Sequence, residues 1–511
     1  MAATSHPLAT LAAIEMLRSG GNAMDAAVTA AAVQAVVEPQ STGIGGDCFV
    51  LFAPKGSAEI KAFNGSGRAP AAATIEWFKS RRYAIVPDYG ALSVTVPGAI
   101  DAWDRLLASY GKKGLDAALA PAIHYAEHGY VVHDRVAFDW NLAVPILMSH
   151  GETARIFLKS GLPFRAGDIH CQPQLAQTLR LIAKHGSKGF YSGEVAEDIV
   201  ETLQEAGGPH TLDDFSAVAG NEMNTVSSDY RGLGVHQMPP NNQGLTGLLM
   251  LNILSGFKLA ELDPLSAERL HLEIEAGRLA YRDRDRFIAD PSFSIVPVGH
   301  LLSPAYAEQL RRSIAPGKAM TNLPDSVVAR GDTVYISVVD KDQNVVSFIN
   351  STFHSFGSGI TSKRSGVVLQ NRGASFRLDP EHPNALAPGK RPMHTIMPGM
   401  VTRIGKCILS FGVMGGDYQP FGHAHVLTNL FDHQMDVQEA VDCPRVFYEN
   451  GRIVAETGIP QNTLSTLEGF GHKVSRTGEP LGGGQAVLID WDRGTLTGAS
   501  DPRKDGCALG F

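Results

Sequence analysis

The chain has 511 residues, of which 44% are hydrophobic, and a formal net charge of −8. This composition indicates a globular protein with a large core, and the acidic balance argues against a nucleic-acid binder, which usually carries a basic face. No apolar run of about 18 residues occurs, so no membrane span is expected.

The first elements are two expected helices, over residues 7–19 and 23–37. The second consists almost wholly of Ala and Val, so we expect it to be buried on most faces. A glycine-rich turn over residues 39–47 then leads into a strand over 48–53. Because this turn precedes a strand and lacks the Lys-Ser/Thr of a phosphate-binding loop, it does not predict a nucleotide site.

The following part of the chain is mostly helical by pattern. Apolar residues recur with helical spacing over 175–185 and 194–206, and a long amphipathic helix is expected over 266–288. Residues 315–332 are polar and contain Pro and Gly. That composition is typical of an exposed, flexible segment.

After residue 332 the pattern changes to strands. Apolar and β-branched runs predict strands over 334–339, 345–350, 367–370, 399–403, 407–411, 452–456 and 486–490, with helices near 421–433 and 436–442. A helix-rich first two-thirds therefore meets a strand-rich last third, without an internal repeat.

The junction of these two parts carries the most informative motif, Gly331-Asp332-Thr333, a polar turn that opens directly into a strand. Two interpretations of Thr333 are open: an ordinary strand residue, or the future N-terminus of a second chain after cleavage of the Asp332–Thr333 bond. A free N-terminal threonine carries both a nucleophile and a base, because its α-amine accepts the proton of its hydroxyl. The reference pKa of an α-amine, about 7.7–8.0, suits proton transfer near neutrality.

At this motif the chain resembles the γ-glutamyltranspeptidase family of N-terminal-nucleophile hydrolases, over nearly its whole length. The order and spacing of several short passages make the resemblance specific, although each passage alone is weak. They are Ser5–Ala9, Gly20–Ala27, Glu38–Gly46, Val96–Gly98, Asp229–Gly232, Met238–Pro240, Phe356–Gly359, Pro388–Pro392 and Met414–Gly416. The resemblance implies the α+β class, as a four-layer αββα sandwich with two stacked, mainly antiparallel sheets.

The resemblance also implies a precursor that cuts itself before Thr333. The products would be a large chain, 1–332, and a small chain, 333–511, which together form one compact unit. Ser351 would support the Thr333 α-amine, and hairpin-like spacing makes the two cross-strand neighbours; a plain strand serine is the alternative. Gly415 and Gly416 would form an oxyanion hole with their backbone N–H groups, and a tight turn without a ligand is the alternative.

The chain departs from the family where γ-glutamyl-specific members bind their substrate. The three positions that hold the substrate's α-amino cation in those members are here Phe353, Arg372 and Ser375. The arginine that clamps the α-carboxylate is replaced by Ser66, and the usual Ser-Ser pair is His394-Thr395. A guanidinium roughly 4 Å from an ammonium disfavours it by about 4 kcal/mol at an effective dielectric of about 20. Arg372 suits a carboxylate instead. We therefore expect an acyl group with a carboxylate and no α-amine.

Oxamate and glutaryl-type amides are the candidate substrates, and the chain looks like the oxamate amidohydrolase-type branch of the family. The alternatives are a structural salt bridge for Arg372 and a satisfied, non-contacting histidine for His394, while Arg68 is a candidate to replace the lost clamp. Two other functions stay open. One is a true γ-glutamyltranspeptidase or glutathione hydrolase with a rebuilt pocket, and the other is an unprocessed, inactive binding protein.

This chemistry requires no cofactor or metal, and the sequence has no HExxH or Rossmann fingerprint. The five cysteines are odd in number and lack zinc-ligand spacing, so we expect free thiols in a reducing compartment. The expected partners are a small-molecule amide and the two chains of one precursor, with a homodimer left open and no nucleic acid or membrane. No secretory leader is visible, so the cytoplasm is expected; the periplasm applies if a leader was removed.

Overall fold

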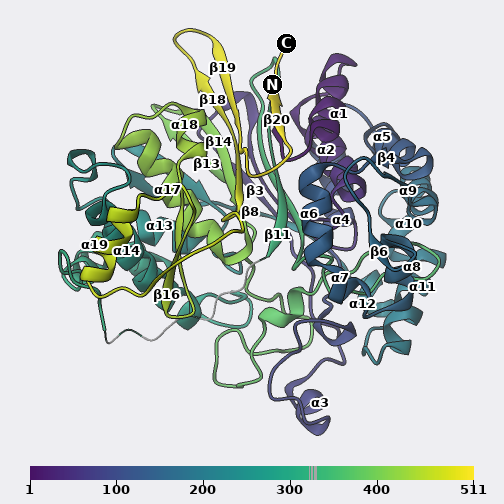
Figure 1. Cartoon of the computed structure of the whole chain (residues 1–511). Helices are drawn as coiled ribbons and strands as arrows, with labels where there is room; N and C mark the ends of the chain where they lie inside the picture. The colour runs from purple at the N-terminus through teal and green to yellow at the C-terminus, as the bar shows by residue number, and fades with distance from the viewer. Residues whose placement is uncertain (322, 324–325, 327–330) are drawn as a thin grey trace.

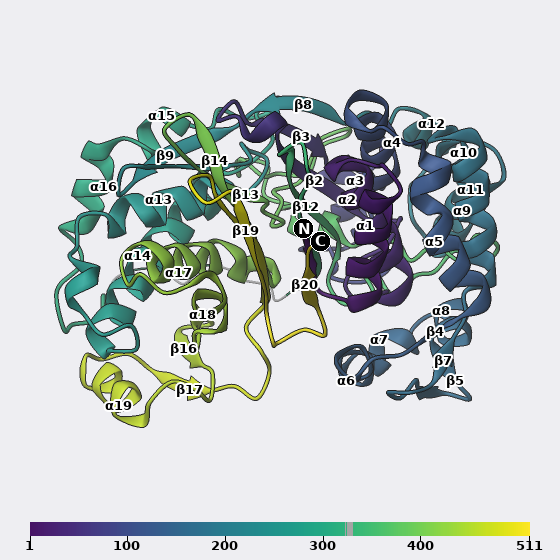
Figure 2. The ribbon, with the colours of Figure 1, turned by 90° about the horizontal axis from the view of Figure 1, so that it is seen from above.

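The computed structural model describes residues 1–321, 323, 326 and 331–511. Two large sheets stack at the centre, and helices cover the outer face of each (Figure 1; Figure 2). This confirms the predicted four-layer α+β sandwich. Part of the predicted flexible segment, residues 322, 324–325 and 327–330, lies outside the described residues.

The first sheet has seven strands, all paired antiparallel. In spatial order they are β20 (Cys507–Leu509), β1 (Ala2–Thr4), β11 (Asp332–Val339), β12 (Val345–Phe353), β2 (Asp47–Ala53), β3 (Lys61–Gly65) and β8 (Asn221–Asn224). The central hairpin β11–β12 starts with Asp332, so the predicted cleavage site lies at the N-terminal end of a central strand of this sheet.

The second sheet has six strands and is also antiparallel. Its order is β19 (Thr495–Ser500), β18 (Gly483–Asp490), β14 (Lys406–Met414), β13 (Gly399–Arg403), β10 (Leu233–Gln237) and β9 (Val226–Tyr230). Three small sheets are formed by β15 (Val446–Glu449), β16 (Arg452–Ala455) and β17 (Val474–Arg476), by β4 (Tyr130–Val131) and β7 (Ile169–His170), and by β5 (Leu158–Lys159) and β6 (Leu162–Pro163).

One helical layer covers the first sheet. Its helices are α1 (Pro7–Arg18), α2 (Ala23–Val37), α4 (Ala99–Tyr110), α5 (Leu115–His128) and α9 (Pro173–His185), with the more peripheral α3 (Ile75–Ser80), α6 (Asp134–Leu142), α7 (Val144–Leu147), α8 (Gly151–Phe157), α10 (Lys188–Tyr191), α11 (Glu194–Glu205) and α12 (Leu212–Ser216). Every residue of α2 is buried, as its Ala/Val composition predicts.

The other helical layer covers the second sheet (Figure 2). It contains α13 (Gly244–Leu254), α14 (Ala267–Phe287), α15 (Val298–Leu301), α16 (Pro304–Arg311), α17 (Gln419–Phe431), α18 (Val437–Asp442) and α19 (Gln461–Gly469). Short 3₁₀ turns occur at η1 (Pro54–Gly56), η2 (Ala91–Ser93), η3 (Leu259–Glu261), η4 (Arg372–Ser375) and η5 (Gly416–Tyr418).

Three apolar cores separate the four layers. One lies between the first sheet and its helices, one between the second sheet and its helices, and one between the two sheets, where Tyr335 and Ile349 meet Met400 and Val487. Among the described helices, none is both long enough and apolar enough to cross a bilayer.

The predicted strand over 367–370 is wrong. This stretch makes only single bridges, Gly45 with Leu369 and Thr361 with Val368. Its backbone groups bond to loops on both sides, since the Gln370 N–H donates to Gly45 and Leu369 accepts from Ser358. An extended, apolar segment therefore does not imply a ladder partner.

Candidate active site

Thr333 is buried at the start of β11, the first strand of the central hairpin, with only 1% of its surface exposed. β11 pairs with β12, but the register shifts between Asp332 and Val334, so Thr333 lies at a bulge. Bulges re-aim a side chain out of the regular alternation. Here the bulge brings the Thr333 hydroxyl back onto the carbonyl of its own preceding residue.

The two predicted hydroxyl residues meet at the scissile carbonyl. Thr333 Oγ1 lies 3.1 Å from Ser351 Oγ, and the two hydroxyls lie 2.7 Å and 2.9 Å from the Asp332 carbonyl oxygen. The Phe353 N–H donates to Ser351 Oγ at 2.9 Å, which leaves the Ser351 proton for the carbonyl. Donors on a carbonyl oxygen stabilise the negative charge that develops there during attack.

The structure describes the uncut chain, so the Thr333 nitrogen is still an amide. Its N–H donates to Asp332 Oδ1 at 3.0 Å, and Ser351 contacts the Thr333 hydroxyl rather than this nitrogen. The predicted role of Ser351 toward a free α-amine therefore stays a prediction.

The predicted oxyanion glycines lie against the scissile segment. Gly415 has φ +120° and Gly416 φ +60°, conformations that favour glycine. A Cβ placed on Gly331 would lie 3.3 Å from the Gly416 Cα, so the turn directly flanks the residue before Asp332. Neither glycine N–H donates a hydrogen bond to any described residue, which leaves both available to a reacting oxygen.

Lys504 is a site residue that the sequence interpretation missed. Its Nζ lies 3.1 Å from Asp332 Oδ1 and 3.8 Å from Asp139 Oδ2, and its side chain is 4% exposed. Although burial opposes ionisation of Asp332, the Lys504 ammonium and the Arg135 guanidinium lower the pKa of this carboxyl. Lys504, Asp332, Gly331 and Gly415 line one cleft of about 180 Å³.

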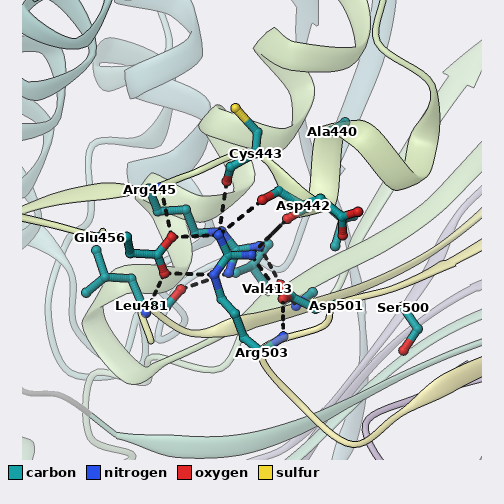
Figure 3. Close-up of polar contacts among 12 residues, drawn as sticks. Val413, Ala440, Asp442, Cys443, Arg445, Glu456, Leu481, Ser500, Asp501 and Arg503 are labelled. Atoms are coloured by element: carbon teal, nitrogen blue, oxygen red, sulfur yellow. Dashed lines mark hydrogen bonds and ion pairs between the residues drawn. The ribbon is translucent and has the colours of Figure 1, made fainter. Parts of the chain in front are cut away.

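A buried ion network fixes the backbone next to Lys504 (Figure 3). Asp501 accepts from Arg445 at 2.6 Å and from Arg503 at 3.0 Å, and Arg503 also binds Glu456 at 2.6 Å. The same network holds the loop that covers Gly415, because Arg445 donates to the Leu481 carbonyl at 2.8 Å. A network of paired, hydrogen-bonded charges is rigid, whereas an unpaired buried charge is costly.

Arg372 is buried beneath Phe353. Its guanidinium lies 3.9 Å from the centre of the Phe353 ring, and its Nη1 donates to Thr395 Oγ1 at 2.8 Å. Its Nε and Nη2 have no partner among the described residues, so the predicted alternative of a structural salt bridge is wrong for the described part of the chain. Burial lowers the pKa of Arg372 to about 9, against the attraction of Asp47 and Asp417.

His394 contacts a carboxylate instead of lining the cleft. Its Nε2 lies 3.0 Å from Asp47 Oδ2, and burial lowers its pKa to about 3. The other oxygen of Asp47 accepts from the N–H groups of Gly67 and Gly98 and from Gln370. Asp47 pairs in register with Ser351, so this polar cluster lies directly behind the hydroxyl pair.

The remaining predicted residues make their described polar contacts with residues other than Thr333. Arg68 donates to the Gly389 carbonyl at 2.9 Å and lies 3.9 Å from Asp290. Ser66 accepts from Asn241 at its hydroxyl and from Arg391 at its carbonyl. The described contact of Ser375 is through its carbonyl, which accepts from Asn384.

The structure therefore brings Thr333, Ser351 and the glycine pair together, with Phe353, Arg372 and Thr395 as a second cluster beside them. It adds Lys504, and also Ser355, whose hydroxyl lines the same cleft without a partner among the described residues. The only sequence signal for Lys504 was its place in Asp501-Pro-Arg-Lys504, 171 positions after Thr333. Without the topology, nothing connects the two.

Comparison with known proteins agrees with this geometry. A sequence model described as Gamma-glutamyltranspeptidase matches residues 9–511. The glutathione hydrolase-like YwrD proenzyme of Bacillus subtilis is 39% identical over 100% of this chain and 98% of its own. The oxamate amidohydrolase proenzyme of Klebsiella pneumoniae is 34% identical over 100% and 98%. The glutathione hydrolase proenzyme of Escherichia coli is 33% identical over 98% and 90%.

Comparison with solved structures also finds a match over almost the whole chain. The crystal structure of cephalosporin acylase from Bacillus halodurans superimposes with a TM-score of 0.93 at 40% identity, over 99% of this chain and 94% of that one. Relatives with this fold and length thus include proteins named for three different substrates.

Proposed function

The chain belongs to the γ-glutamyltranspeptidase family of enzymes that act on amide bonds, and from that premise we propose a self-processing amidohydrolase. Its substrate is the amide of a small acyl group that carries a carboxylate and no α-amine. Oxamate-like and glutaryl-like amides are the candidates. The observation that carries this proposal is the buried Arg372 guanidinium, which has two nitrogen atoms without partners among the described residues.

Self-processing begins at the hydroxyl pair. Thr333 Oγ1 attacks the Asp332 carbonyl carbon, the C–N bond to Thr333 breaks, and the nitrogen leaves as an α-amine that takes the hydroxyl proton. Water then hydrolyses the Asp332–Thr333 ester, which gives a large chain ending at Asp332 and a small chain starting at Thr333. The contacts of Ser351 and Thr333 with the Asp332 carbonyl support this order of events.

Turnover repeats the same chemistry on a substrate. The α-amine accepts the Thr333 hydroxyl proton, the oxygen attacks the substrate carbonyl, and the amine product leaves with that proton. The N–H groups of Gly415 and Gly416 stabilise the oxyanion. Water then hydrolyses the acyl-Thr333 ester, releasing the acid and restoring the hydroxyl.

The charges around Arg372 favour a carboxylate over an ammonium. The two carboxylates that attract it are already engaged, Asp47 by four donors and Asp417 by Arg284 at 2.5 Å. A substrate α-ammonium would meet a guanidinium whose two neighbouring carboxylates are already engaged by described residues. Phe353 covers the guanidinium and lies beside Gly331, where an added Cβ would be 3.4 Å from the ring atom Cδ2, so departure of the cut segment would open space next to that ring.

A pair of anilides tests the proposal. Glutaryl and γ-glutamyl p-nitroanilides differ only in the α-amine, and release of nitroaniline reports both. We expect kcat/KM for the glutaryl compound to be about tenfold or more above that for the γ-glutamyl compound, because repulsion of 1.4 kcal/mol gives a factor of about ten. The Thr333→Ala variant is the matched blank, and ammonia release measures oxamate in parallel.

A glutathione hydrolase is the second candidate, favoured by the names of two relatives. Faster release from the γ-glutamyl anilide would support it and overturn the amine-free proposal.

A further inference from the structure

We propose that Lys504 binds the substrate carboxylate and selects four-carbon acyl groups of the succinyl type. This inference rests on the proposed amine-free, carboxylate-bearing acyl group and deepens it, because it assigns to that group a length between those of the oxamate-like and glutaryl-like candidates.

The uncut chain contains its own acyl substrate. In self-processing Thr333 receives the acyl group of Asp332, whose carbonyl oxygen lies 2.7 Å from Thr333 Oγ1. The side-chain carboxylate of that acyl group is separated from the reacting carbonyl by two carbons, as in a succinyl group. It lies 3.1 Å from Lys504 Nζ. Lys504 therefore already binds a carboxylate at a fixed distance from a carbonyl that Thr333 attacks.

Cleavage changes the balance of charge around Lys504. Asp139, the other close carboxylate, lies 3.8 Å away and is paired with Arg135 at 2.8 Å. Glu38 lies within reach of the same field, but burial raises its pKa to about 7. When the segment ending at Asp332 withdraws, a buried ammonium loses its closest partner. An uncompensated buried charge is costly, so an incoming carboxylate is favoured there.

Lys504 cannot easily follow the departing aspartate. Its backbone N–H donates to Asp501, which the Arg445–Arg503 network holds, and its stem packs against Gly483, where an added Cβ would lie 2.8 Å from Lys504 Cγ. The side chain is 4% exposed. A cation held at one distance from the nucleophile favours acyl groups whose carboxylate lies at that distance from the reacting carbonyl.

Arg372 does not compete for this role. Its guanidinium stacks 3.9 Å from the centre of the Phe353 ring and does not line the cleft that Lys504, Asp332 and Gly415 share. Arg372 thus disfavours a substrate ammonium through electrostatic repulsion, whereas Lys504 contacts the substrate carboxylate.

The test is a length series on the mature wild-type enzyme. Oxalyl, succinyl and glutaryl p-nitroanilides place zero, two and three carbons between carbonyl and carboxylate, and butyryl p-nitroanilide is the neutral analogue of the succinyl compound. A displacement of about 1 Å can cost 10²-fold, so we expect succinyl to exceed glutaryl and oxalyl by about tenfold or more in kcat/KM. Succinate should inhibit more strongly than glutarate or butyrate.

The Lys504→Met variant tests the residue itself. Its ratio of succinyl to butyryl kcat/KM should fall about tenfold or more, because a hydrogen bond between two charged groups is stronger than one between neutral groups. Lys504→Arg keeps the charge and should retain most of the ratio. Lys504 also contacts Asp332, so each variant is measured only on the fraction that a denaturing gel shows to be cut. The wild-type inhibition series does not depend on that step.

The uncut Thr333→Ala protein is the negative control, because Asp332 still occupies Lys504. Calorimetry should detect succinate binding to the mature enzyme and none to this precursor. Glutaryl or oxalyl exceeding succinyl, or an unchanged succinyl-to-butyryl ratio in Lys504→Met, would overturn this inference while leaving the amine-free proposal intact. A higher kcat/KM for the γ-glutamyl than for the glutaryl anilide would instead overturn the proposed function on which this inference rests.

Discussion

The two sides of the Asp332–Thr333 bond are built in opposite ways. On the threonine side the functional groups are hydroxyls of adjacent strands, β11 and β12, supported by backbone N–H groups. On the aspartate side they are charged side chains from remote segments, with Lys504 near the C-terminus and Asp139 on α6. The proposed cutting chemistry therefore depends on local pairing, whereas the proposed recognition of substrate depends on how distant parts of the chain assemble.

Removal of the nucleophile should give the largest effect. Thr333→Ala lacks the attacking oxygen, so we expect one band at 54.6 kDa on a denaturing gel and no hydrolysis above the blank. Thr333→Ser retains a hydroxyl and should still cut itself, more slowly. Turnover by the alanine variant would show that another group attacks, and the threonine side would then lose its special role.

Alteration of the oxyanion turn should rank second. Gly415→Ala must hold a side chain at φ +120°, with its Cβ only 3.0 Å from the Gly482 Cα. We expect the turn to shift and kcat to fall by roughly 10²–10³, the usual loss for one oxyanion donor. Gly405→Ala, at a positive-φ turn with open space, is the matched strain control and should leave kcat within about threefold. Equal losses in both variants would point to general strain rather than lost donors.

This contrast also explains what the sequence could predict. The α2 helix, the β11–β12 hairpin and the glycine turn follow from composition, alternation and short motifs, because each depends on neighbouring residues. The strand expected over 367–370 failed because its partners are loops. Phe353 and Arg372 could be assigned to the pocket by resemblance, but their stacking could not, and Lys504 required knowledge of where the C-terminal segment packs.

Substitution of Arg372, whose guanidinium is covered by Phe353, should have a smaller effect on substrate choice. Arg372→Met removes the repulsion of an α-ammonium, so the ratio of γ-glutamyl to glutaryl kcat/KM should rise by about thirtyfold, since roughly 7 Å at a dielectric of about 20 corresponds to about 2 kcal/mol. Arg372→Lys keeps the charge and is the control. An unchanged ratio in the methionine variant would mean that the aspartate side alone governs recognition, through Lys504.

The smallest effect on turnover should come from substitution of Glu38. The change expected there is in the free energy of unfolding. Burial raises the pKa of Glu38 from 4.5 to about 7. The folded chain therefore binds this proton more tightly than the unfolded chain, and its contribution is lost as pH rises from about 4.5 to 7. At 1.36 kcal/mol per pKa unit, the loss approaches about 3 kcal/mol. Glu38→Gln should thus melt higher than its parent at pH 8, both in the uncut Thr333→Ala background, with the difference shrinking toward pH 4.5. A difference that is the same at pH 5 and pH 8 would show that Glu38 stays ionised in the fold, and Lys504 would then keep a second carboxylate after cleavage.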